Sequence, residues 1–129
     1  MINKKIIKKI QEIVRKYTKI KLVYFFGSRA KGNFNKDSDY DFAIYIKSKN
    51  TKEMGDIKMR LMVQLMKLLP SEKIDIVVLN QDNPTLDFEI CRTGIVIYEE
   101  EPYRILIESK IISMYFDYYM DLKKYNLTK

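Results

Sequence analysis

The chain of 129 residues contains no histidine and no tryptophan, and it has a single cysteine, Cys91. The absence of histidine excludes a Ser-His-Asp hydrolase, histidine-based acid-base catalysis and a ribonuclease that depends on histidine. One cysteine excludes an internal disulfide and a cysteine-rich zinc site. Any bound metal is therefore expected on oxygen ligands, which favours Mg²⁺ or Mn²⁺.

Long hydrophobic runs are also missing. No apolar stretch approaches the ~20 residues that cross a membrane, and Met1–Lys5 does not lead into the apolar core of a signal peptide. With 47% hydrophobic and 32% charged residues, the composition suits one globular domain over residues 1–129. We expect a cytoplasmic protein that does not bind membranes.

Positive charge is concentrated at the N-terminal end of the sequence. Residues 1–36 carry eleven Lys and Arg against the single acid Glu12, whereas the rest of the chain carries thirteen against sixteen acids. Such a basic segment attracts nucleotides, RNA or an acidic protein. The alternative is that most of these lysines only solvate the outer face of a helix.

The segment Leu22–Ile46 carries the strongest functional signal. Two runs rich in aromatic and β-branched residues, 22–26 and 42–46, predict strands on either side of a polar, basic loop. Because side chains alternate along a strand, Asp39 and Asp41 are expected to project from the same face. Two carboxylates this close repel each other unless a cation lies between them. A hard ion such as Mg²⁺, shared with the phosphates of a nucleotide, is their natural partner.

Two familiar loops come close to this segment without matching it. The glycine spacing at 27–32 is that of a P-loop, but Asn33 and Phe34 stand where Lys and Ser or Thr are required. Residues 37–41 imitate the first positions of an EF-hand loop. Phe42 then occupies the position that requires glycine, and an apolar strand follows instead of a flexible loop.

A third pattern fits: Gly27-Ser28 is followed, after ten intervening residues, by Asp39-x-Asp41. This arrangement resembles the signature of the minimal nucleotidyltransferases, or MNT domains, of the DNA polymerase β superfamily. The resemblance extends from about residue 20 to residue 98, and it implies a third carboxylate on a later strand. Asp75 lies inside a later apolar run, where a charge is costly unless it is paired or binds metal. If that strand lies beside the Asp39–Asp41 strand, Asp75 completes a cluster of three carboxylates.

The remaining apolar patterns complete the predicted domain. With the resemblance, they imply an α/β (α+β) fold in which helices flank a small mixed sheet of about four strands, with its core at about 20–98. Helices are predicted over 3–17, 54–69, 84–91 and 103–125, and strands over 20–26, 42–46, 73–79 and 95–98.

The predicted C-terminal helix, 103–125, has apolar residues on nearly every face. One side is expected to pack inward, and the rest to form a docking surface for a partner, since exposed aromatic residues and methionines favour interfaces. The expected inward residues are Ile105, Ile112, Tyr115 and Tyr119, and the expected outward residues are Ile111, Met114, Phe116, Tyr118 and Leu122.

The resemblance implies a nucleotidyltransferase that uses ATP and two Mg²⁺ ions, with Mn²⁺ as the alternative metal. The triphosphate is expected at the Gly-Ser turn and the metals at the carboxylates. The implied nucleotide-binding residues are Gly27, Ser28 and Arg29, and the implied catalytic metal ligands are Asp39, Asp41 and Asp75.

MNT domains are commonly the antitoxins of HEPN-domain RNase toxins. The resemblance therefore implies transfer of AMP to a tyrosine hydroxyl of such a toxin. Two alternatives stay open: inhibition by stoichiometric binding alone, and a transferase that acts on RNA or a small molecule. Nucleic acid is the less favoured partner, because the sequence shows no aromatic-basic recognition motif. The target residue, the number of AMP units, the base preference and the homo- or hetero-oligomeric state are left open.

Overall fold

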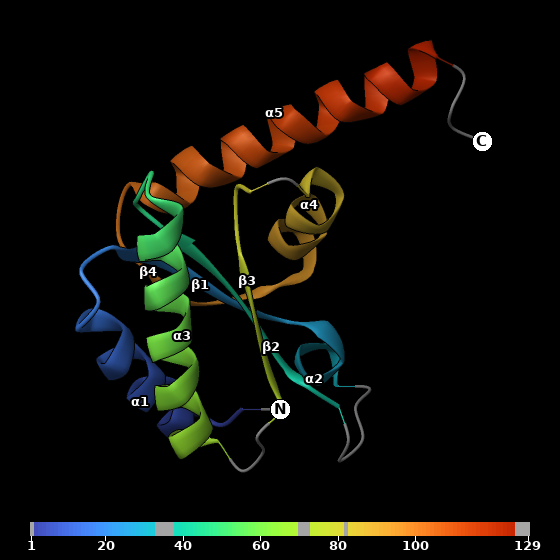
Figure 1. Cartoon of the computed structure of the whole chain (residues 1–129). Coiled ribbons are helices and arrows are strands. Elements are labelled where there is room, and N and C mark those ends of the chain that lie inside the picture. The colour runs from blue at the N-terminus through green and yellow to red at the C-terminus, as the bar shows by residue number, and fades with distance from the viewer. Residues whose placement is uncertain (1, 33–37, 70–72, 82, 126–129) are drawn as a thin grey trace.

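Within residues 2–32, 38–69, 73–81 and 83–125, which the computed structural model describes, four strands form one mixed sheet and five helices lie around it (Figure 1). The fold class predicted from the sequence is thereby confirmed. The strands are β1 (Ile20–Phe26), β2 (Tyr40–Ile46), β3 (Ile74–Val78) and β4 (Ile95–Glu99). The helices are α1 (Lys4–Arg15), α2 (Gly27–Lys31), α3 (Thr51–Leu68), α4 (Pro84–Thr93) and α5 (Tyr103–Lys124).

The strand order in the sheet is β3-β2-β1-β4. β1 is antiparallel to both β2 and β4, whereas β3 runs parallel to β2. A parallel pair needs a crossover connection, which α3 provides. The parallel register places Asp75 directly beside Asp41. The condition on which the sequence analysis placed Asp75 near the acidic pair is therefore met.

Helices α1 and α3 cover one face of the sheet, and α4 and α5 cover the other (Figure 1). Successive side chains of β2 divide between these two layers, as the pleat of a strand requires. Phe42 and Ile44 join the core with Ile10 of α1 and Leu61 of α3, whereas Ala43 belongs to the core under α4 and α5. This alternation decides which layer the acidic side chains face.

Asparagine side chains cap the starts of α1, α3 and α4. Asn3, Asn50 and Asn83 each accept a hydrogen bond from the backbone N–H three residues later, at 2.9, 3.0 and 3.2 Å. The Asn50 cap begins α3 at Thr51, three residues before the predicted start at Met54. The apolar stripe alone predicted the later start, because the first turn of this helix is polar.

Helix α5 packs with a different side from the one predicted. Ile107 and Ile111 are buried, and the Tyr115 ring stacks on Phe88 of α4 with 4.0 Å between ring centroids. Residues four apart lie on one side of a helix. Packing against both α4 and the sheet determines which side of α5 is buried. The prediction that Ile111 faces outward is therefore wrong. Three residues predicted to pack inward are instead exposed: Ile105, Ile112 and Tyr119.

The C-terminal half of α5 extends past α4, away from the sheet (Figure 1). It exposes large apolar side chains, among them Phe116 at 58%, Tyr118 at 43% and Met120 at 58%. Despite these side chains, none of the helices formed by the described residues is long and apolar enough to cross a membrane.

Candidate active site

Asp39, Asp41 and Asp75 lie on the same face of the sheet, where β2 and β3 begin. Asp41 and Asp75 are partners in the parallel register, so their side chains point to the same side. Asp39 lies two residues before Asp41, next to the start of β2, and its charge acts on the Asp41 carboxylate. Two residues further along each strand, Ala43 and Val77 pack under α4 and α5. The carboxylates consequently occupy the face opposite to α1, and the lysines of α1 lie in the other layer.

Gly27 lies against the Asp41 side chain. Phe26, the last residue of β1, is paired with Asp41, and Gly27 then turns the chain into α2 with a φ of +81°. A Cβ built on Gly27 would overlap the Oδ2 atom of Asp41 and lie 3.1 Å from its Cγ. Glycine satisfies both this conformation and this close approach. The glycine turn and the Asp41 carboxylate therefore belong to one site.

Helix α2 presents its first turn at this site. Phe26 stands at its N-cap and supplies no side-chain hydrogen bond to that turn. The first N–H groups of a helix have no partner within the helix, so they suit an anion such as phosphate. Ser28 lies in this turn and is half-buried. Its assignment to nucleotide binding stays a prediction.

The carboxylate of Asp41 is held in an unfavourable electrostatic environment. Partial burial, followed by the negative charges of Asp75 and Asp39, raises its pKa to about 6. Burial and like charge both disfavour the ionised form, and a cation between the carboxylates removes the second effect. The site therefore favours a bound cation.

The chemistry of this donor set fits Mg²⁺ or Mn²⁺, because hard divalent ions prefer carboxylate oxygens. Among the described residues, no three acidic, histidine or cysteine side chains are close enough together to enclose a metal ion as they stand. Asp39 and Asp75 are exposed, so burial does not fix their rotamers. They are the ligands expected to move toward the ion, with Asp41 fixed beside Gly27.

Arg29 is buried, with 6% of its surface exposed. Its Nε donates a hydrogen bond of 2.9 Å to the Ser38 carbonyl, and its guanidinium lies 4.1 Å from the centre of the Tyr40 ring. These contacts join α2 to the residues on either side of Asp39. Arg29 therefore positions the start of β2, and its predicted contact with the nucleotide stays a prediction.

Comparison with known proteins decides the family. The model of the family described as Polymerase beta, Nucleotidyltransferase matches residues 8–103. The chain belongs to this nucleotidyltransferase family. The protein adenylyltransferase MntA of Aphanizomenon flos-aquae (strain 2012/KM1/D3) is 36% identical to it over 95 residues, which cover 68% of this chain and 63% of that protein. The match thus spans less than two thirds of that relative's length.

Solved structures of toxin–antitoxin complexes share the fold of this chain. A chain of an MntA–HpeT complex has a TM-score of 0.76 and 23% identity, over 92% of this chain and 93% of that one. A chain of a toxin–antitoxin structure with AMP-PNP has a TM-score of 0.75 and 24% identity, over 95% of this chain and 94% of that one. A chain from the structure of a tri-AMPylated HEPN toxin with its MNT antitoxin, from Shewanella oneidensis, has a TM-score of 0.65 and 21% identity. The match covers 92% of this chain and 91% of that one.

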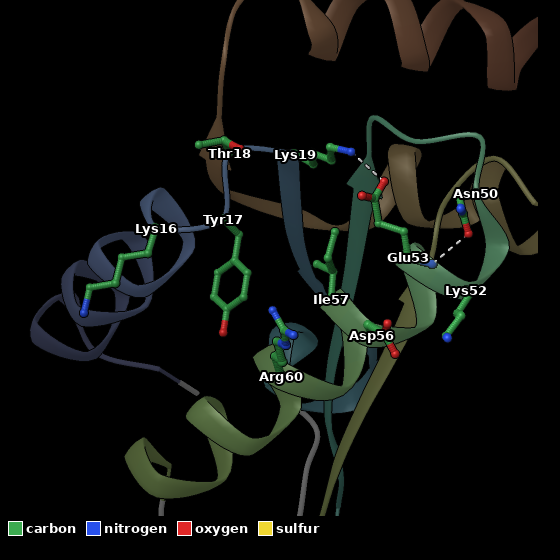
Figure 2. Close-up of a pocket in the computed structure, with 10 residues that line it drawn as sticks. All are labelled: Lys16, Tyr17, Thr18, Lys19, Asn50, Lys52, Glu53, Asp56, Ile57 and Arg60. Atoms are coloured by element: carbon green, nitrogen blue, oxygen red, sulfur yellow. Dashed lines mark hydrogen bonds and ion pairs between the residues drawn. The ribbon is translucent and has the colours of Figure 1, made fainter.

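A hollow of about 450 Å³ lies away from the carboxylates, between the end of α1 and the start of α3 (Figure 2). An ion pair of 2.6 Å between Lys19 and Glu53 stands in its wall. Lys19 precedes β1, whereas Gly27 follows it, so this hollow is at the other end of the strand from the acidic site. None of the predicted site residues is among the described residues that line it. It is not the catalytic centre.

A second hollow, of about 440 Å³, lies alongside Asp75 and was not predicted from the sequence. We call it the β3 groove. Its lining residues are Thr51, Met54, Gly55 and Lys58 of α3, Asp75, Ile76, Val77 and Val78 of β3, and Gln81. The available signal in the sequence was Gly55, because glycine inside a helix lowers the stability of that helix.

Proposed function

We propose that this nucleotidyltransferase transfers AMP from ATP to a tyrosine hydroxyl of a HEPN-domain RNase toxin and so neutralises it. The observation that carries the proposal is the set of three carboxylates on one sheet face beside the Gly27 turn, in a chain of this family. The relatives support it. The Aphanizomenon MntA is named a protein adenylyltransferase, and one structural relative comes from a complex with an AMP-modified HEPN toxin.

The triphosphate of ATP is proposed to lie at the start of α2. There the backbone N–H groups of the first turn donate hydrogen bonds to phosphate oxygens. Gly27 lets the phosphates approach the backbone closely, and the small Ser28 side chain leaves the approach open while offering a hydroxyl. The same turn lies against Asp41, so the bound phosphates are next to the carboxylates.

Asp39 and Asp41 would hold two Mg²⁺ ions, with Mn²⁺ as the alternative, and Asp75 would hold the one nearer the acceptor. When bound, such a metal pair stabilises the attacking and leaving oxygens of an in-line displacement at phosphorus. Asp75 is exposed and in register with Asp41, which supports its proposed role in accepting the proton of the acceptor hydroxyl. The hydroxyl oxygen bonds to the α-phosphorus, the bond from that phosphorus to the bridging oxygen breaks, and pyrophosphate leaves.

Helix α5 is the proposed docking element for the toxin. Its first half is fixed to the domain, where Tyr24 donates a hydrogen bond to Glu108 and Tyr115 stacks on Phe88. Its second half exposes aromatic residues and a methionine, Phe116 and Met120 each at 58%. Aromatic and methionine side chains are enriched in interface cores. The same surface favours a second candidate function, in which the chain inhibits its partner by binding alone.

Intact-mass spectrometry of a HEPN toxin, after incubation with the chain, ATP and Mg²⁺, tests the proposal. The expected result is a gain of one or more AMP masses. The gain should disappear in the double variant Asp39→Asn/Asp41→Asn, because Asp75 alone cannot hold both metals, and it should weaken less with Ser28→Ala. A stable complex without any mass gain would favour inhibition by binding. Neither a complex nor a gain would direct the search to RNA and small molecules as acceptors.

A further inference from the structure

We propose that the β3 groove binds an extended segment of the acceptor protein as an added β-strand and so presents the acceptor hydroxyl to Asp75. The inference rests on the proposed transferase function and adds how that function recognises its acceptor. The groove has about 440 Å³ of space, and Asp75 belongs both to its wall and to the acidic cluster. A segment lying in it therefore ends at the site of transfer.

The backbone of β3 has hydrogen-bonding groups on the groove side that no described strand pairs with. The Lys73 carbonyl accepts a hydrogen bond from the Tyr40 N–H, and the Leu79 N–H donates to β2, each at 2.8 Å. Because alternate residues of a parallel strand bond to the same neighbour, the N–H and C=O of Ile76 and Val78 point away from β2. Within the described sheet, β3 has a strand partner on one side only. Such an edge is a template for an added strand.

The shape of the groove follows this edge. Its wall includes four successive residues of β3, Asp75 to Val78, which belong alternately to the two faces of the sheet. A hollow on one face alone would be lined by every second residue. The first turns of α3 form the opposite wall, beside β3 (Figure 1). The groove is therefore open to a chain that lies parallel to the strand and bonds to its backbone.

Strand pairing determines where the acceptor side chain would lie. A residue of the added strand opposite Asp75 points to the same face as Asp75, with about 5 Å between their Cβ atoms. That face carries Asp41 and Asp39, so a hydroxyl side chain at this position reaches the acidic cluster. The neighbouring residues point to the opposite face, toward the α3 wall with Met54 and Lys58. The fitting segment has a hydroxyl residue flanked by apolar or acidic side chains.

Gly55 keeps the groove open. It lies inside α3, outside the left-handed conformation that favours glycine, and a Cβ built on it meets no atom of the described residues within 4 Å. Neither backbone conformation nor packing against the described residues requires a glycine here, although alanine would stabilise the helix. A larger side chain at this position would occupy the space that the added strand needs.

The test fills the groove without disturbing the carboxylates. Gly55→Trp is expected to lower kcat/KM for AMP transfer to a HEPN toxin by about tenfold or more, with KM for ATP unchanged, because only the acceptor is displaced. Gln64→Trp is the matched control: Gln64 is exposed on the same helix, nine residues further and hence on the opposite side. Transfer by this control should equal that of the wild type. Equal rates for the two tryptophan variants would overturn the proposal.

Hydrogen exchange of the complex between the wild-type chain and the toxin gives a second, independent readout. The N–H groups of Ile76 and Val78 are expected to become protected, since they face the added strand. If exchange of both N–H groups is unchanged in a complex that transfers AMP, the proposal for the β3 groove is wrong, whereas the proposed transferase function stands. If the wild type transfers no AMP, the proposed function fails first. If Gly55→Trp does not fold, this exchange measurement decides.

Discussion

Replacing Gly27 by alanine is expected to reduce AMP transfer far more than it reduces stability. Two costs arise from one methyl group. The φ of +81° places the new side chain in the left-handed region, and the new Cβ overlaps the Asp41 Oδ2 atom. The overlapping atom is the end of a side chain, so it can move aside. The stability of the fold is therefore lowered mainly by the backbone strain. The activity is lowered because a proposed metal ligand, Asp41, is displaced.

The two magnitudes follow from these geometries. Left-handed backbone costs a residue with a Cβ about 1–2 kcal/mol. For a domain of this size, such a loss of stability lowers the melting temperature by roughly 4–7 °C. To restore contact distance, the Asp41 carboxylate must move by about 1 Å, and a displacement of that size in an active site can cost about a hundredfold in rate. Gly27→Ala is thus expected to fold and to lose nearly all transfer.

Gly32→Ala separates the two effects. Gly32 has nearly the same φ, +84°, but a Cβ built on it meets no atom within 4 Å in the part of the chain that the structure describes. Both variants should lose similar stability in thermal unfolding, whereas Gly27→Ala alone should lose transfer measured by mass gain of the toxin. Equal transfer by the two variants would refute the reasoning that the Gly27 turn fixes the Asp41 carboxylate.

Three further outcomes are expected. Arg29→Ala should lower the free energy of unfolding, measured in urea, by about 2–3 kcal/mol. The substitution removes the buried guanidinium, together with its hydrogen bond to the Ser38 carbonyl and its contact with the Tyr40 ring. Its kcat should fall more than its KM for ATP rises, whereas a rise in KM alone would indicate a nucleotide ligand instead. Burial raises the pKa of Asp87, partly offset by the hydrogen bond from the Asn80 N–H. The folded state therefore binds that proton more readily than the unfolded state, and Asp87→Asn should stabilise the protein at pH 7. In urea titrations this gain should shrink as the pH falls toward about 4, and a gain independent of pH would contradict the assignment. Phe116→Glu should leave the melting temperature unchanged and weaken the toxin complex in titration calorimetry, and an unchanged affinity would exclude this part of α5 from the interface.

The sequence alone determined the parts of the site whose geometry is local. Asp39 and Asp41 share a face because they are two residues apart on an extended chain, and this holds in any fold that makes that segment a strand. Gly27 and Ser28 were identified through the resemblance to MNT domains, whose signature sets their distance from the pair. The absence of histidine left oxygen ligands as the donors for a metal. These inferences needed only local chemistry, residue spacing and the resemblance to a known signature.

Only the tertiary structure determined the features that depend on contacts between segments far apart in the sequence. Asp75 joins the acids because β3 pairs with β2 in one register, across a helix of eighteen residues. Arg29 is buried because Tyr40 and Ser38 fold over it. The inward side of α5 was mispredicted, since its apolar residues surround the helix and only packing against α4 selects among them. The β3 groove likewise exists only where α3 and an edge strand lie side by side. Long-range packing, rather than local preference, sets these features, because no short segment contains both of the surfaces in contact.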